Sequence, residues 1–234
     1  FFPSTLFKKM IEPLVPFSIK GAIWYQGESN VGRHKQYKTL FPELIKDWRE
    51  KWDKEFSFYY VQIAPYRYEK RLKNQKSQKL REAQKIGLQL PKTGMVVTLD
   101  IGDINNIHPA KKKEVGKRLS NLALKNDYGL NKIAESPRYK NNKVVNDRLI
   151  IEFEYAELGL VLKNSSKYGF EIAGENKKFY KSRVKIKDNN LISLHSKFVK
   201  EPKYVRYAWS DTSSANLFNV EGLPASSFTT ESDY

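Results

Sequence analysis

One short stretch places the strongest constraint on how this chain folds. Residues 22–25 (Ala-Ile-Trp-Tyr) are continuously apolar, and a compact polar run, Gln-Gly-Glu-Ser-Asn at 26–30, follows at once. A short apolar run of this kind is typical of a buried strand in a parallel sheet. Open α/β sheets bind ligands just beyond the carboxyl ends of their strands, which makes residues 26–30 a candidate site. The alternative is an ordinary turn from strand to helix.

A second polar loop follows another predicted strand. Residues 94–99 are apolar and lead into residues 100–109, which end in His108-Pro109. Histidine titrates near neutral pH and is the usual general base for acyl transfer. The amide of Gln26 and the backbone N–H of Gly27 are available as donors to an oxyanion. Interpreted locally, Ser29 in a Gly-x-Ser turn would be the nucleophile and His108 its base.

The remaining patterns predict an α/β part followed by a β-rich part. Helices are expected at 5–11, 39–54, 77–89 and from 109 to 126, and a further strand is expected at 56–64. This alternation predicts a mostly parallel sheet with flanking helices. Short strands are then expected at 144–153, 159–162, 169–173, 183–186, 191–195 and 205–209. We therefore predict an α/β domain at 1–128 and a small all-β domain at 129–234, either a sandwich or a β-rich extension folded onto the first domain.

Composition excludes several kinds of site. The 234 residues include no cysteine, which excludes disulfides, thiol catalysis and Cys-based zinc sites. The three histidines are far apart in sequence, so no metal site is expected. The net charge of +16 is spread along the chain, which favours a solvated Lys-rich surface over a nucleic-acid partner. The basic stretch at 66–79 is the one segment that could attract a polyanion. No apolar run is long enough for a membrane span.

Several segments, in order along the chain, carry a resemblance to a known family. They are Trp24 to Asn30, Leu80-Arg81-Glu82-Ala83-Gln84, Asp100-Ile101-Gly102-Asp103 and Ile107-His108-Pro109, with shorter matches at 3–14, 40–42, 47–49, 206–209 and 222–225. These segments resemble the sialate O-acetylesterases, a branch of the SGNH hydrolase superfamily. The resemblance implies an SGNH-like, mostly parallel sheet with flanking helices, here partial, followed by the small all-β domain.

The same resemblance implies that the nucleophile lies outside these residues. In that family the serine belongs to an earlier block, which has no counterpart here, so the chain is expected to be a carboxy-terminal portion. The upstream half of the same protein is then the expected partner. On this view His108 is the general base, Gln26 and Gly27 are oxyanion-side donors, and Glu28 braces the loop. Ser29 then lies on the oxyanion side of the site.

This sequence departs from the usual SGNH pattern in the group that orients the histidine. Many SGNH enzymes place an aspartate three residues before it, whereas this chain has Asn105 there. Either Asp103 or a backbone carbonyl orients His108, or catalysis uses a Ser–His dyad.

The implied chemistry is removal of acetyl esters from sugar hydroxyls without a metal or organic cofactor. An O-acetylated sialic acid would need a cation for its carboxylate, and Arg81 or Arg67 could provide one, although either could instead serve in a structural ion pair. Acetylated xylan or another plant glycan is the alternative substrate. A non-catalytic carbohydrate-binding module, with Trp209 stacking on sugar rings, is the alternative of another class. The family implies a bacterial periplasmic or secreted protein.

Overall fold

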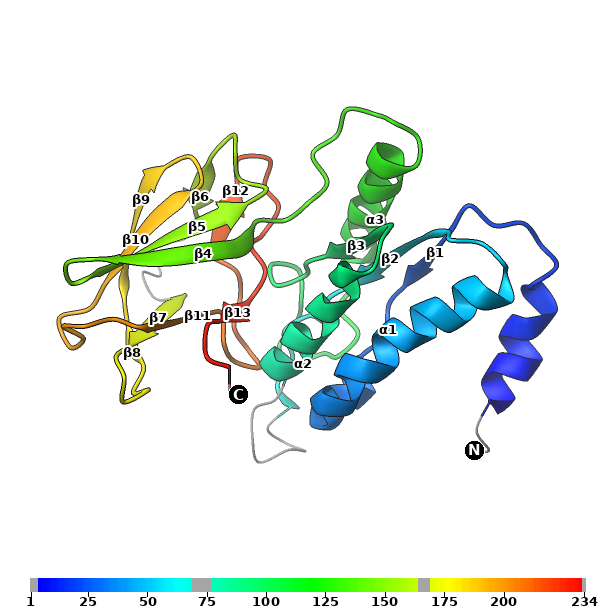
Figure 1. Ribbon diagram of the computed structural model, residues 1–234, viewed down its shortest axis with the longest axis horizontal. Coiled ribbons are helices and arrows are strands. Elements are labelled where there is room, and N and C mark those ends of the chain that lie inside the picture. The colour runs from blue at the N-terminus through cyan, green and yellow to red at the C-terminus, as the bar shows by residue number, and fades with distance from the viewer. Residues whose placement is uncertain (1–3, 69–76, 164–168, 233–234) are drawn as a thin grey trace.

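A computed structural model describes residues 4–68, 77–163 and 169–232 (Figure 1). Most of the predicted basic stretch at 66–79 lies outside the described residues. Two lobes are visible: an α/β lobe, residues 4–126, and a β lobe, residues 138–232, joined by an extended connection. The predicted boundary between 128 and 129 falls in this connection, and the division into two domains stays a prediction.

The α/β lobe contains a three-stranded parallel sheet in the order β1-β2-β3. Its strands are β1 (Gly21–Trp24), β2 (Ser57–Val61) and β3 (Thr93–Val96). Its main helices are α1 (His34–Lys51), α2 (Ser77–Gln84) and α3 (Lys112–Asn126). Shorter helical turns are η1 (Phe7–Ile11), η2 (Glu12–Leu14), η3 (Glu28–Arg33) and η5 (Lys85–Gln89). The predicted mostly parallel sheet with flanking helices is thereby confirmed.

Helices cover both faces of the central strand. Alternate side chains of β2 point to opposite faces, as in any strand. Phe58 and Tyr60 belong to the apolar cluster shared with α1 and α2, and Tyr59 and Val61 to the cluster shared with α3. All four are buried, so the sheet is the middle of three layers.

The prediction that the first strand is buried was wrong. Among the described strands, β1 pairs only with β2. Ile23, a residue of β1, is 70% exposed. Trp24 points to the other face, where it packs against Trp48 and Phe58 with ring centroids 5.7 and 6.3 Å apart. The main contacts of α3 with the sheet are to β2 and β3. An apolar run indicates that a strand is suited to burial, but it does not show which neighbour covers it.

The N-terminal helical segment also carries exposed apolar side chains. No residue of η1 or η2 is buried. Leu6, Met10, Leu14 and Phe17, three or four residues apart, are each about half exposed or more. The segment projects from the lobe in Figure 1.

The β lobe is built of antiparallel strands throughout. One sheet has the order β4-β5-β10-β9, a second β13-β11-β7-β8, and β12 pairs with β6. The bounds are β4 Arg138–Val145, β5 Arg148–Glu154, β6 Leu160–Leu162, β7 Phe170–Ala173, β8 Tyr180–Lys181, β9 Arg183–Asp188, β10 Leu191–His195, β11 Tyr204–Tyr207, β12 Leu217–Asn219 and β13 Phe228–Thr229. Aromatic side chains join the two larger sheets, for example Phe153 and Phe228, whose ring centroids are 6.0 Å apart. The arrangement is sandwich-like.

The predicted strand at 144–153 is strand at both ends, but a hairpin turn interrupts it: residues 144–145 close β4 and residues 148–153 belong to β5. Val145 pairs with Arg148, leaving Asn146-Asp147 as a two-residue turn. Asn146 has φ of 54°, a conformation that asparagine tolerates better than most residues.

Apolar packing and backbone hydrogen bonds hold the lobes together. A single cluster of buried side chains runs from Val31 to Phe228. Tyr66 N donates to Asp211 O at 3.0 Å, and Ala215 N to Leu99 O at 3.1 Å. The chain from 211 to 228 therefore returns to the α/β lobe.

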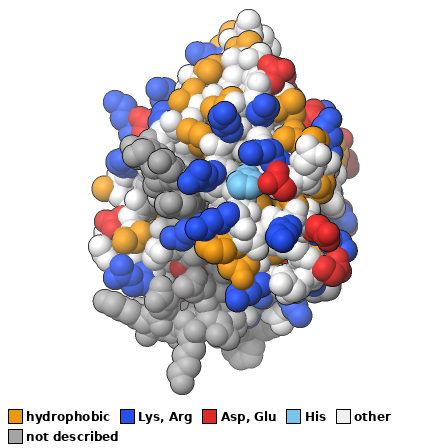
Figure 2. All heavy atoms as spheres, turned by 90° about the vertical axis from the view of Figure 1, so that its left-hand side faces the viewer, with side chains coloured by type: hydrophobic (Ala, Val, Ile, Leu, Met, Phe, Trp, Pro, Cys, Tyr) orange, Lys and Arg blue, Asp and Glu red, His pale blue; other side chains and the backbone are white. Residues whose placement is uncertain are grey.

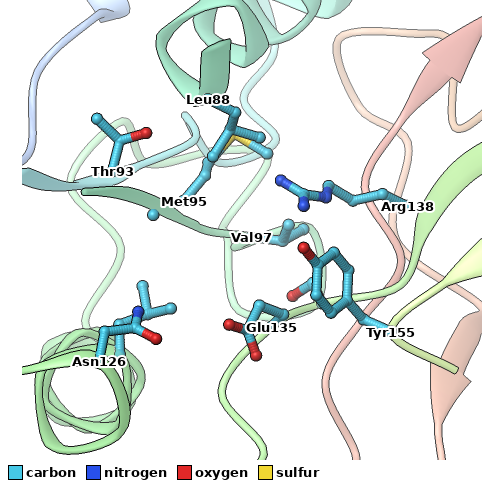
Figure 3. A pocket seen from close by; sticks show the side chains of 11 residues that line it. Leu88, Thr93, Met95, Val97, Asn126, Glu135, Arg138 and Tyr155 are labelled. Atoms are coloured by element: carbon cyan, nitrogen blue, oxygen red, sulfur yellow. The ribbon is translucent and has the colours of Figure 1, made fainter. Parts of the chain in front are cut away.

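A small cavity of about 60 Å³ lies where the lobes meet. Figure 3 shows that its lining comes from β3, α3 and the start of β4, among other segments. Arg138 Cζ lies 4.5 Å from the centroid of the Tyr155 ring. Glu135, also in the lining, pairs with Lys125. The cavity has room for a few water molecules but not for a sugar, and it contains none of the candidate residues.

Lys and Arg side chains are spread over the outer face of the β lobe (Figure 2). A hollow of about 490 Å³ in this lobe is lined by Lys181, Arg183, His195, Ser196, Lys197 and Phe198. Within the described ranges, no helix is long and apolar enough to cross a bilayer. No three His, Cys, Asp or Glu side chains of those ranges gather as they would around a metal ion.

Candidate functional site

The two polar loops singled out in the sequence meet at one hollow. His108 from the loop after β3 and Glu28 and Ser29 from the loop after β1 line a space of about 480 Å³, together with Tyr25, Ile107 and Lys112. A second hollow of about 370 Å³ shares Glu28, Ser29 and Ile107, and is completed by Val31, Gly32, Arg33, Tyr66 and Tyr68. The two hollows therefore form one continuous surface, which we call the candidate cleft. Because β1 and β3 are parallel, their carboxyl ends lie at the same edge of the sheet.

Gln84 fixes the first loop to the central sheet. Its Nε2 donates to Val61 O at 3.1 Å and to Gln26 O at 3.4 Å, while its Oε1 accepts from Ile63 N at 3.0 Å. A Cβ on Gly27 would lie 2.8 Å from Ile63 Cγ2 and 3.1 Å from Gln84 Nε2. Only glycine fits this approach without a shift. Gln84 was not predicted as a site residue, although it lies in the Leu-Arg-Glu-Ala-Gln segment that resembles the family.

Gln26 and Gly27 lie behind the cleft rather than in its lining. Gly27 is buried, and the Tyr37 hydroxyl is 3.5 Å from both Gln26 oxygens, at the limit for a hydrogen bond. Burial raises the pKa of Tyr37 to about 12, so this hydroxyl stays protonated and can donate. The structure therefore places Glu28 and His108 in the same hollow. The oxyanion role of Gln26 and Gly27 stays a prediction.

An ion pair holds the second loop to α3. Arg118 Nη1 and Nη2 donate to Asp100 Oδ1 and Oδ2 at 2.7 and 2.6 Å, and Nη1 also donates to Val97 O at 2.6 Å. The pair is largely buried. A bidentate arginine–carboxylate pair fixes orientation as well as distance. It therefore fixes the start of the loop that carries His108.

Two side-chain turns shape the rest of this loop. Asp103 Oδ1 accepts from Asn105 N at 2.8 Å, and Asn106 Oδ1 accepts from His108 N at 2.9 Å. Neither Asp103 nor Asn105 forms a hydrogen bond with the His108 imidazole. His108 is exposed, and no side chain of the described residues forms a hydrogen bond with its ring. The structure therefore does not bring either predicted orienter to the histidine.

Arg81 is placed where it cannot reach a ligand. Its side chain is fully buried, and Nε, Nη1 and Nη2 donate to Ser227 Oγ, Ser77 Oγ, Ala208 O and Ser210 O. Burial lowers its pKa to about 10, an effect that the Asp211 carboxylate opposes. The prediction that Arg81 binds a substrate carboxylate does not agree with this geometry. Arg81 joins α2 to the returning chain of the β lobe.

Other predicted contacts are less well defined. Arg67 is half-buried, and its backbone N–H donates to Ile104 O at 3.0 Å. Trp209 is half-buried as well. Neither lines the candidate cleft.

The cleft contains aromatic and basic side chains that sequence reasoning missed. Burial and the nearby Glu28 carboxylate raise the pKa of Tyr25 to about 12, and they also raise the pKa of Tyr68. Lys112 Nζ lies 4.6 Å from the centroid of the Tyr25 ring. The available signal was position alone, since Tyr25 precedes the loop at 26–30 and Lys112 follows His108 by four residues.

Comparison with known proteins identifies the family of the chain. The family of carbohydrate esterases described as sialic acid-specific acetylesterases matches residues 4–125. The chain belongs to this family.

Individual relatives are similar over large parts of the chain. A carbohydrate acetylesterase from Xanthomonas citri superimposes on 99% of the chain with a TM-score of 0.93 and 33% identity. Human sialate O-acetylesterase is 30% identical over 190 residues, 73% of the chain, and the mouse enzyme is 35% identical over 138 residues, 50% of the chain. The chain spans 55% of the Xanthomonas structure, 36% of the human enzyme and 25% of the mouse enzyme.

Proposed function

We propose that this chain forms part of a carbohydrate O-acetylesterase that removes acetyl groups from sialic acid, with His108 as the general base. The observation that carries the proposal is the meeting of His108 with Glu28 and Ser29 in one hollow of the cleft, of about 480 Å³. Three tyrosines line the cleft and its continuation, and aromatic faces suit the apolar faces of sugar rings. Membership of the carbohydrate esterase family supports the reaction class.

The reaction would follow the serine–histidine scheme. His108 takes the proton of a serine hydroxyl as its oxygen attacks the acetyl carbonyl, and then protonates the departing sugar oxygen. Water, activated by His108, cleaves the acetyl-serine ester and releases acetate. The oxyanion would be stabilised at the loop of Gln26 and Gly27, and Glu28 would brace that loop. Since no described carboxylate bonds to the imidazole, the proposal is a Ser–His dyad or a backbone carbonyl as the orienting group.

The nucleophile is proposed to come from a polypeptide segment outside these residues, the upstream half of the same protein. Support comes from the exposed edge of β1, where Ile23 is 70% exposed, and from the exposed apolar side chains of the η1–η2 segment. Both features lie on the α/β lobe (Figure 1). A further strand pairing with β1 would satisfy the N–H and C=O groups of β1 that point away from β2. Ser29 would then stay on the oxyanion side.

A fluorophosphonate probe tests the assignment of the nucleophile. The complete protein, with all flanking sequence, would be labelled and every peptide analysed by mass spectrometry. We expect the label on a serine outside residues 1–234, its loss in His108→Ala and its retention in Ser29→Ala. A label on Ser29 would refute the assignment, and no label in the active wild-type protein would refute a serine mechanism.

The sugar and the compartment need separate tests. Acetate release from O-acetylated sialic acid and from acetylated xylan, at matched acetyl concentration, would distinguish the proposed substrate from the plant-glycan alternative. Faster release from xylan would overturn the sialate proposal while leaving the esterase proposal intact. A periplasmic or secreted location is also proposed, and activity confined to the cytoplasmic fraction of the source cells would contradict it.

A further inference from the structure

One cation in the candidate cleft forms no ion pair among the described residues. Lys112 lines the same hollow as His108, and its Nζ lies 4.6 Å from the centroid of the Tyr25 ring. In the described part of the chain, no carboxylate pairs with its ammonium group and no oxygen accepts a hydrogen bond from Nζ, whereas its backbone N–H donates to Ala110 O at 2.7 Å. Its charge is therefore directed into the cleft, beside the proposed general base.

The position of Lys112 is not explained by the stability of its helix. It is the first residue of α3, where the positive end of the helix dipole disfavours cations. Lys113, the next residue, is exposed like Lys112, but it does not line the cleft. The cation–π contact with Tyr25 restricts the ammonium group to the cleft wall. A lysine held in this way has lost part of its side-chain freedom before a ligand arrives, which favours binding.

We propose that Lys112 binds the carboxylate of an acidic sugar and so selects acidic over neutral acetylated sugars. This inference rests on the proposed esterase function and adds the residue that determines its substrate class. The hollow of about 480 Å³ is large enough for one sugar residue that contacts His108 and Lys112 together. An ammonium–carboxylate hydrogen bond is among the stronger polar contacts.

Two other basic residues near the cleft already donate hydrogen bonds within the protein. Arg81 is buried with all three of its guanidinium nitrogens bonded. Arg33 lines the adjoining hollow, where its Nη2 donates to Ser29 O at 3.2 Å. Glu28 lies in the same hollow as Lys112 and would repel a carboxylate placed next to it. The acidic group of the sugar is therefore oriented toward Lys112 and away from Glu28.

The test compares one substrate pair in the complete protein. The pair is an O-acetylated sialic acid and its carboxamide, which keeps the shape and removes the charge, with release of acetate as the readout. Lys112→Met should lower kcat/KM for the acid about 10- to 100-fold, the size expected for a charge-assisted hydrogen bond. The loss should appear mainly in KM, leave the carboxamide unchanged and be partly rescued by Lys112→Arg. Lys113→Met, which removes an equal charge one residue further along, is the matched control.

The outcomes separate this inference from the proposed function. Equal losses on acid and carboxamide, or the same selective loss in Lys113→Met, would overturn the role of Lys112. Unaltered hydrolysis of the acid by Lys112→Met would overturn it as well. If the wild-type protein releases no acetate from either substrate, or from 4-nitrophenyl acetate, the esterase proposal fails. Calorimetric binding of free sialic acid and its carboxamide to wild type and Lys112→Met would then still decide the inference.

Discussion

Replacing Arg81 by methionine tests whether this arginine joins the two lobes. The substitution keeps an unbranched side chain of moderate length but removes the charge and every N–H donor. Four acceptors lose a bond: Ser77 Oγ, Ala208 O, Ser210 O and Ser227 Oγ. Asp211, also fully buried, loses the cation that compensates its charge.

The magnitude follows from two opposing terms. Hydrogen bonds to a charged group contribute about 1.5–3 kcal/mol each, so four bonds represent about 6–12 kcal/mol. Burial lowers the pKa of Arg81 from 12.5 to about 10, and at about 1.36 kcal/mol per unit this corresponds to about 3 kcal/mol against the charged form. The uncharged methionine side chain does not have this desolvation cost. The difference is consistent with the net loss of about 3–5 kcal/mol that follows removal of one partner from a buried polar network.

Urea unfolding at pH 7, followed by tryptophan fluorescence, measures this loss. Arg67→Met is the matched control, because Arg67 is only half-buried, and it should cost less than about 1 kcal/mol. A loss below about 1 kcal/mol in Arg81→Met would refute the structural role. If sialic acid binding nevertheless fell sharply, Arg81 would have to be a ligand-binding residue after all.

Three further perturbations follow from the structure. Asp100→Asn should lower the free energy of unfolding by about 2–4 kcal/mol, because it breaks a largely buried pair with Arg118. It should also lower acetate release, and lost activity at wild-type stability would contradict the role of the pair. Gly27→Ala should cost about 1–3 kcal/mol in urea unfolding, since its Cβ would lie 2.8 Å from Ile63 Cγ2, and the cost should shrink in an Ile63→Ala background if that contact is its cause. Burial raises the pKa of Tyr207 to about 12 from 10.0, so the folded state holds this proton more tightly than the unfolded state. The stability that this difference gives is therefore complete below pH 10 and lost as pH rises toward 12, by about 3 kcal/mol in all, and Tyr207→Phe should show a shallower fall over that range.

Local patterns predicted the elements of the α/β lobe and the meeting of its two loops. The strands before residues 26 and 100 are parallel, so their carboxyl ends had to lie at one edge once the alternation of strand and helix was recognised. That geometry brings His108 to Glu28. Two of the bonds that shape the second loop are also local, in the turns from Asp103 to Asn105 and from Asn106 to His108.

What the sequence could not predict depends on contacts between distant residues. The exposure of Ile23 depends on what packs on that face of β1, and the apolar pattern of residues 22–25 does not show whether anything does. Arg81 bonds to acceptors as many as 146 residues away, so its burial could not be inferred from the segment around it. In the hairpin, the turn at Asn146 and Asp147 was overlooked because apolar residues precede and follow it.

The open edge of β1 has a consequence for handling this polypeptide. A row of free N–H and C=O groups beside an exposed isoleucine is a template on which another extended chain can add. Expressed without the segment proposed to cover it, the chain would expose this template together with the apolar side chains of η1 and η2. We therefore expect residues 1–234 alone to aggregate through β1, and Ile23→Lys, which places a charge on that edge, to reduce aggregation measured by light scattering.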